Sequence, residues 1–111
     1  MTTRPRSPAA GPLCSLVACL VLAFPAAARS GDRALGEYLS SECVTCHQVS
    51  GRQTAGIPAI VGLPEDAFVA MMNSYKRRER ENQVMQTMAA RLSEEEIAAL
   101  AAYFGSLRPQ N

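Results

Sequence analysis

The sequence is short, evenly charged and poor in aromatic residues. Its 111 residues carry 11 basic and 10 acidic side chains, one histidine, four cysteines and no tryptophan. This balance leaves no polybasic surface of the kind that binds nucleic acid or an anionic membrane. A chain of this length is expected to fold as one domain with a small core.

Residues 1–28 have the composition of a secretory signal peptide. Arg4 and Arg6 precede an apolar run from Leu13 to Phe24, and Pro25-Ala26-Ala27-Ala28 forms a small-residue cleavage site. The apolar run is shorter than the roughly 20 residues that a membrane-spanning helix needs. We therefore expect an exported chain that is cleaved after about Ala28.

The apolar run also contains an alternative cleavage site, which its surroundings disfavour. Leu16-Val17-Ala18-Cys19 resembles a lipoprotein box, but only a short apolar stretch precedes it and residues 20–24, also apolar, would remain on the mature side. Cleavage after Ala28 leaves a single domain, residues 29–111, with nine basic and ten acidic side chains and a net charge of −1. Such a short chain is expected to need a bound group to complete its core.

The mature chain begins with a predicted helix from Arg33 to Cys46. Asp32 is a suitable N-cap, and the helical period brings Leu35, Tyr38 and Leu39 to one face. Gly36 interrupts this helix at a cost of about 1 kcal/mol relative to alanine. A glycine at this position either lies free on the surface or allows another backbone to approach closely.

The helix ends in Cys43-Val44-Thr45-Cys46-His47, the C-x-x-C-H pattern that attaches haem covalently. The two thiols would form thioethers with the haem vinyl groups, and His47 would bind the iron from the same side. A zinc site would need further ligands, and Cys14 and Cys19 lie in the segment expected to be removed. A thioredoxin-like site would need a βαβ setting. A plain disulfide would not explain why the single histidine follows Cys46. The sequence therefore predicts one covalent haem c.

Gln48 to Ile60 has no sustained period and contains glycines and Pro58, so it is expected to be a loop along the haem edge. The Pro58 carbonyl could accept the Nδ1–H of His47, which would fix the tautomer of the imidazole. Composition alone favours the simpler interpretation of Pro58 as a turn residue.

Gly62-Leu63-Pro64 introduces a second predicted helix that ends at about Lys76. A stripe of apolar side chains follows the helical spacing: Phe68, Met71, Met72 and Tyr75. The charged run 76–81 comes next and is either a solvated surface or a patch that binds haem propionates or a partner protein. Tyr75 and Arg80 are the candidates for the propionates.

The last predicted helix begins at a capping box, Ser93 with Glu96, and ends near Gly105. Its buried stripe is Ile97, Leu100, Ala101 and Phe104. Small residues on this helix would suit a tight crossing with Gly36. The mature chain has no strand pattern, which predicts an all-α domain of three to four helices around the haem.

The sixth iron ligand decides between two classes of function. An open site would suit catalysis or gas sensing, whereas a filled one would suit electron transfer. His47 is the only histidine, so a second histidine ligand is excluded within one chain. A methionine thioether is the alternative, and it raises the reduction potential. The spacing offers Met85 and Met88 equally.

Five segments together resemble a class I bacterial cytochrome c domain, similar to those of the periplasmic dihaem cytochromes c and of the cytochrome subunit of flavocytochrome c sulfide dehydrogenase. The resemblance extends over residues 32–107. The segments are Cys43–His47, Ile57–Gly62, Tyr75-Lys76 with Arg80, Val84-Met85 and Leu92–Phe104.

The resemblance implies thioethers at Cys43 and Cys46 and axial ligands His47 and Met85. It also implies that the Pro58 carbonyl holds His47, and that the first and last helices cross at Gly36.

The function expected from motif and resemblance is one-electron transfer by a periplasmic monohaem cytochrome c. The chain would be a diffusing shuttle or the electron-accepting subunit of a flavoprotein dehydrogenase that oxidises sulfide, and not an enzyme by itself. Expected partners are that flavoprotein and a terminal oxidase or another cytochrome. A catalytic or gas-sensing haem with a labile sixth ligand is the alternative.

Overall fold

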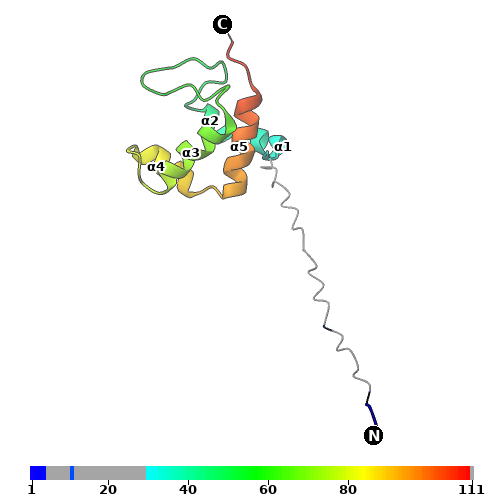
Figure 1. Cartoon of the computed structure of the whole chain (residues 1–111). Coiled ribbons are helices and arrows are strands. Elements are labelled where there is room, and N and C mark those ends of the chain that lie inside the picture. The colour runs from blue at the N-terminus through cyan, green and yellow to red at the C-terminus, as the bar shows by residue number, and fades with distance from the viewer. Residues whose placement is uncertain (5–10, 12–29, 111) are drawn as a thin grey trace.

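The computed structural model describes residues 1–4, 11 and 30–110, and its regular secondary structure is helical (Figure 1). The helices are α1 Arg33–Leu39, α2 Ser41–Val44, α3 Glu65–Lys76, α4 Gln83–Ala90 and α5 Glu94–Ser106. An isolated bridge between Thr54 and Ile57 is the one strand-like pairing within these ranges. The predicted all-α class is confirmed. Most of the predicted signal peptide lies outside the described residues.

The helix count differs from the expected three to four at two places. The helix predicted for 33–46 is divided at Ser40, whose Oγ donates to the Glu37 carbonyl at 2.7 Å. A serine that bonds back to its own turn competes with the regular helical pattern. The second difference is α4, which begins after the N-cap Asn82 and was not predicted from the sequence.

The predicted helix starts are confirmed at both ends of the domain. Asp32 accepts hydrogen bonds from the backbone N–H groups of Ala34 and Leu35, at 2.9 and 3.2 Å. Ser93 and Glu96 form the reciprocal capping box at the start of α5, at 3.1 and 2.8 Å. These caps satisfy backbone donors that have no partner inside the helix.

The first and last helices cross at Gly36, as expected. A Cβ added at Gly36 would collide with the backbone carbonyl of Ala99 in α5. Gly31, just before α1, lies equally close to the backbone of Ala98. The glycines therefore let α1 lie directly on the backbone of α5, and Figure 1 shows the two helices crossing.

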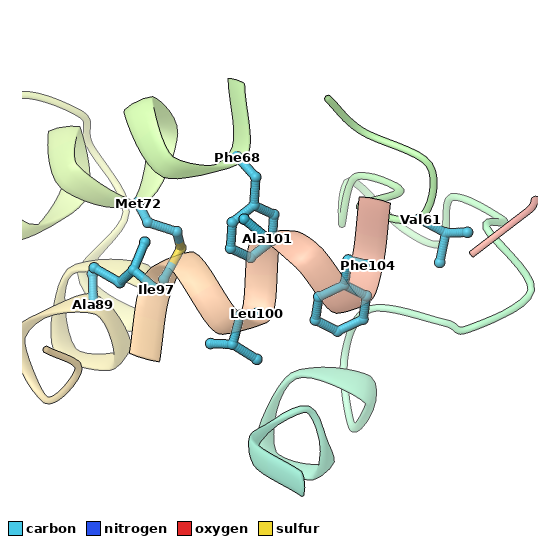
Figure 2. Packing of buried hydrophobic residues seen from close by; sticks show 8 residues of the cluster. All are labelled: Val61, Phe68, Met72, Ala89, Ile97, Leu100, Ala101 and Phe104. Carbon is cyan, nitrogen blue, oxygen red and sulfur yellow. The ribbon is translucent and has the colours of Figure 1, made fainter. Parts of the chain in front are cut away.

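The core is built around one face of α5 (Figure 2). The predicted stripe of α5 is buried to 1% exposure or less. Phe68 from α3 stacks on Phe104 of α5, with ring centroids 5.9 Å apart. Met72 lies beside Ile97 and Ala89 in the same cluster. Of the predicted α3 stripe, Phe68 and Met72 are the buried members of this core.

Within the described part of the chain, none of the helices combines the length and apolar character that crossing a membrane requires.

Candidate functional site

A cavity of about 580 Å³ lies between α2, the loop after it, α3 and the segment that contains α4. Its walls are mostly apolar, and the volume is in the range of about 300–1,000 Å³ found for ligand and cofactor sites. Six of its lining residues were singled out in the sequence as possible haem contacts and two more as alternative sixth ligands: Cys43, Cys46, His47, Pro58, Tyr75 and Arg80, with Met85 and Met88.

The two cysteines and the histidine reach this cavity because the chain continues to turn after α2 ends. The Cys43 carbonyl accepts from the backbone N–H of Cys46 at 3.2 Å and from that of His47 at 2.8 Å. Cys43 is half-buried, Cys46 is exposed, and both are free thiols. One helical turn therefore presents both thiols and the imidazole at one edge of the cavity.

The environment of Cys43 disfavours its thiolate. Burial, with a smaller contribution from the neighbouring Glu42 carboxylate, raises the pKa of the Cys43 thiol to about 11. Both effects act in the same direction, because a thiolate is destabilised by low polarity and by a nearby negative charge. In this folded arrangement the free thiol is protonated at neutral pH.

The imidazole of His47 is buried, at 8% exposure, and its Nδ1 lies 2.8 Å from the carbonyl oxygen of Pro58. A carbonyl can only accept, so Nδ1 carries the proton and donates it to Pro58. The neutral imidazole then presents the lone pair of Nε2, which is the form that binds a metal ion. The loop brings Pro58 back over His47 through positive φ angles at Ala55 and Gly56, 46° and 81°.

Four methionines line the cavity, two from α3 and two from α4: Met71, Met72, Met85 and Met88. Met72 is 6% exposed and belongs to the core cluster, which agrees with the gap-filling role expected from its helical spacing. Met85 and Met88 are both partly buried and one helical turn apart in α4. The structure thus brings both candidates to the cavity, and the choice between them made from resemblance stays a prediction.

Arg80 lies over the ring of Tyr75, with its guanidinium carbon 5.2 Å from the ring centroid, and both residues line the cavity. A guanidinium held on an aromatic face keeps its hydrogen-bond donors free for a carboxylate. The pair therefore places one cation at the wall of a mostly apolar site, whose lining also includes Glu42.

The rest of the charged run has other contacts. Lys76 donates to the Leu92 carbonyl at 2.5 Å and lies 3.5 Å from Glu94. Arg77 forms two hydrogen bonds with Glu79, at 2.8 and 2.9 Å, and this exposed pair raises the pKa of Arg77 and lowers that of Glu79. Arg80 is the one residue of the charged run 76–81 that lines the cavity.

Two features of the site were missed in the sequence. Asn82 lines the cavity and caps α4. An Asn directly before eight residues with an amphipathic pattern is a sequence signal for a helix start, and it could have predicted this cap. Val84 also lines the cavity and is 67% exposed, so an apolar side chain stands at the cavity mouth. Val84 belongs to one of the segments that carry the family resemblance, but nothing in the sequence indicated that it is exposed.

The residues present fit a covalently attached porphyrin. The apolar walls suit the macrocycle, the two free thiols lie beside the single imidazole, and a guanidinium is available for a propionate. No group of three or more His, Cys, Asp or Glu side chains that could hold a metal ion occurs in the described ranges. An all-helical domain that presents C-x-x-C-H at the edge of an apolar cavity defines the class of c-type cytochromes.

The chain belongs to the cytochrome c family, whose model matches residues 34–108. It is 37% identical over 95 residues to a thiosulfate dehydrogenase electron acceptor of Thiomonas intermedia, covering 84% of this chain and 43% of that protein. It is 34% identical to the cytochrome subunit of sulfide dehydrogenase of Chlorobaculum tepidum, covering 68% and 69%. It is also 35% identical to cytochrome c-554(548) of Halomonas halodenitrificans, covering 69% and 98%.

The resemblance to class I c-type cytochromes is therefore confirmed, and with it the cofactor, a covalently bound haem c with its iron. The protein transfers electrons, as its family does. The chain spans less than half the length of the Thiomonas relative.

Proposed function

We propose that this chain is a periplasmic monohaem cytochrome c whose iron is bound by His47 and Met85 and whose haem is tethered through Cys43 and Cys46. The observation that carries the proposal is the 2.8 Å contact between His47 Nδ1 and the Pro58 carbonyl, which leaves Nε2 free beside the two thiols. When bound, haem c supplies a one-electron Fe(II)/Fe(III) couple.

The residues around the cavity have distinct tasks in this proposal. Cys43 and Cys46 retain the cofactor in a small domain, and Pro58 fixes the orientation of His47. The thioether of Met85 would be the second protein ligand of the haem iron, and a methionine ligand raises the reduction potential. Ligands that stay the same in both oxidation states would keep the structural change on electron transfer small.

We assign Met85, not Met88, as the sixth iron ligand because of the family resemblance and because of its position in α4. Its backbone N–H is held by the Asn82 side chain at 3.0 Å, so its place at the start of the helix is fixed. Met88 reaches the same cavity one turn later and is the natural competitor.

Carbon monoxide binding by the ferrous protein tests the ligand assignment. We expect Met85→Ala to bind CO rapidly and Met88→Ala to behave as wild type. The reverse result would transfer the role to Met88. Rapid CO binding by the wild type would favour a catalytic or gas-sensing haem with a labile sixth ligand.

Tyr75 and Arg80 are assigned to the haem propionates. Support comes from their pairing at 5.2 Å and their place in the cavity wall. A guanidinium and a carboxylate form a charge-assisted, directional contact.

The partners we propose are redox proteins, with a dehydrogenase that oxidises a reduced sulfur compound as the donor. Two relatives are named as the electron acceptor or cytochrome subunit of such dehydrogenases. A flavoprotein that oxidises sulfide is the favoured donor, and a terminal oxidase or another cytochrome the favoured acceptor. Co-purification from the native source separates the options, since a stable subunit would bring its flavoprotein along and a shuttle would elute alone.

The periplasmic location rests on the predicted signal peptide and on the family. Mass spectrometry of the exported protein tests it, with an N-terminus at about Arg29 and the added mass of one haem expected. A lipid-modified N-terminus at Cys19 would overturn the proposed cleavage site.

A further inference from the structure

Asn82 occupies an unusual backbone conformation directly before α4. Its φ is 148° and its ψ is 104°, a backbone conformation that residues other than glycine rarely adopt. Two other non-glycine residues in the described ranges have positive φ, Ala55 and Arg78. A strained residue is retained when its side chain makes a compensating contact.

That contact is the cap of α4. Asn82 Oδ1 accepts from the backbone N–H of Met85 at 3.0 Å, and the Asn82 carbonyl accepts from the N–H of Gln86 at 2.9 Å. The Gln86 side chain in turn donates to the Arg80 carbonyl at 2.9 Å. The start of α4 is thus tied to the loop before it at three points.

Met85 depends on this cap and Met88 does not. The first four backbone N–H groups of a helix have no partner inside the helix, and Met85 is the third residue of α4. Met88 is the sixth, so its N–H is within reach of an intrahelical carbonyl. Fraying of the first turn would therefore displace the Met85 side chain before that of Met88.

We propose that Asn82 is a positioning residue for the sixth iron ligand: its side-chain hydrogen bond to the Met85 backbone holds the thioether on the iron. This inference rests on the proposed ligand role of Met85. Asn82 acts through the helix start and need not touch the cofactor.

The test uses the haem-loaded protein with Asn82→Ala, Asn82→Gly and Asn82→Asp. Ser93→Ala is the matched control, because Ser93 caps α5 through an equivalent contact at 3.1 Å to Glu96 N. The readouts are the rate of CO binding to the ferrous protein, the charge-transfer absorption of the ferric iron–thioether bond, and the thermal midpoint. CO binds only while the thioether is detached, so its rate reports on Met85 itself.

We expect Asn82→Ala to bind CO about fivefold faster, the effect of losing a typical N-cap on a local equilibrium. Asn82→Asp keeps the acceptor and should stay within about twofold of wild type. Asn82→Gly relieves the backbone strain but lacks the acceptor, so it should also bind CO faster even if its thermal midpoint is unchanged. Ser93→Ala should lower the thermal midpoint and leave CO binding unaffected.

The inference is overturned if Asn82→Ala and Asn82→Gly bind CO at the wild-type rate. It is also overturned if Ser93→Ala accelerates CO binding to the same extent, since global stability would then explain the effect. Met85→Ala, measured alongside, separates this failure from that of the ligand assignment. If Met85→Ala keeps a closed sixth position, the proposed ligand is wrong; if it opens, only the role of Asn82 is at stake.

Discussion

Gly36 of α1 and Ala99 of α5 meet backbone to backbone, with no room for a side chain between them. This contact joins the helix that leads into the haem-binding motif to the helix that carries most of the core. Because the two backbones touch, α1 has a fixed position against α5, and so do Cys43 and His47, which follow α1 in the chain.

Helix propensity predicts that Gly36→Ala stabilises the protein, and we expect the opposite. In an exposed helix this change would stabilise by about 1 kcal/mol. Here the new Cβ would collide with the Ala99 carbonyl, so we expect a net destabilisation of about 1–3 kcal/mol. Chemical denaturation of the haem-loaded protein measures it, with the exposed neighbour variant Glu37→Ala as a control expected to change little. A Gly36→Ala protein more stable than wild type would show that the crossing can relax.

Most of the fold was predictable because it follows from short-range signals. The Asp32 and Ser93 caps are local hydrogen bonds with a sequence signature, and the α5 stripe follows the helical period. The break at Ser40 was not predictable in this way. Serine is tolerated inside helices, and only the bond of its hydroxyl to Glu37 shows that this one ends a helix.

The site could be predicted only where covalent chemistry dictates spacing. C-x-x-C-H has such spacing, so Cys43, Cys46 and His47 stood out. Methionine has no fixed spacing, and α4 presents Met85 and Met88 to the same cavity. No spacing rule singles out Arg80 in a run of charges either, because its contact with Tyr75 depends on the turn after α3.

The haem-free chain is expected not to fold, because the described core has only three large side chains below 2% exposure, Phe104, Ile97 and Leu100. Cys43→Ser or Cys46→Ala should therefore give a sharply lower yield of folded protein. Circular dichroism and thermal melting of the unloaded wild-type chain check this, and a helical, cooperatively melting form would contradict it.

Thiol reactivity gives an independent measure of the same state. In the folded arrangement burial raises the Cys43 pKa to about 11, so Cys43 would react slowly at pH 8 while the exposed Cys46 reacts readily. In an unfolded chain Cys43 returns to an ordinary pKa of about 8.5, and the two thiols react at similar rates. We expect similar rates for the unloaded chain. A Cys43 rate that lags at pH 8 and rises steeply toward pH 11 would show that the cavity forms without haem.

The charged run after α3 is expected to contribute little to partner docking. The Lys76 ammonium lies 3.5 Å from a Glu94 carboxylate oxygen, and Arg77 is paired with Glu79, so their charges are partly neutralised locally. Reversal of Arg77 and Arg78 to glutamate should therefore change the rate of haem reduction by a partner only modestly. Stopped-flow measurements at low and high salt check this, because a docking patch would show a large loss at low salt that salt screening removes.

The Arg80 guanidinium is expected to raise the reduction potential of the bound haem. It is a positive charge at the cavity wall, and such a charge disfavours the more positive ferric state. Arg80→Gln should therefore lower the midpoint potential, by about 20–60 mV for a charge several ångströms away in a partly solvated site. Arg80→Lys keeps the charge but not the planar contact with Tyr75, so it should recover part of the loss. Arg78→Gln, in the same run but outside the set of cavity residues, is the matched control and should shift the potential little. Equal shifts for Arg78→Gln and Arg80→Gln would mean that the haem senses only the general charge of the run, and the assignment of Arg80 to a propionate would then fail.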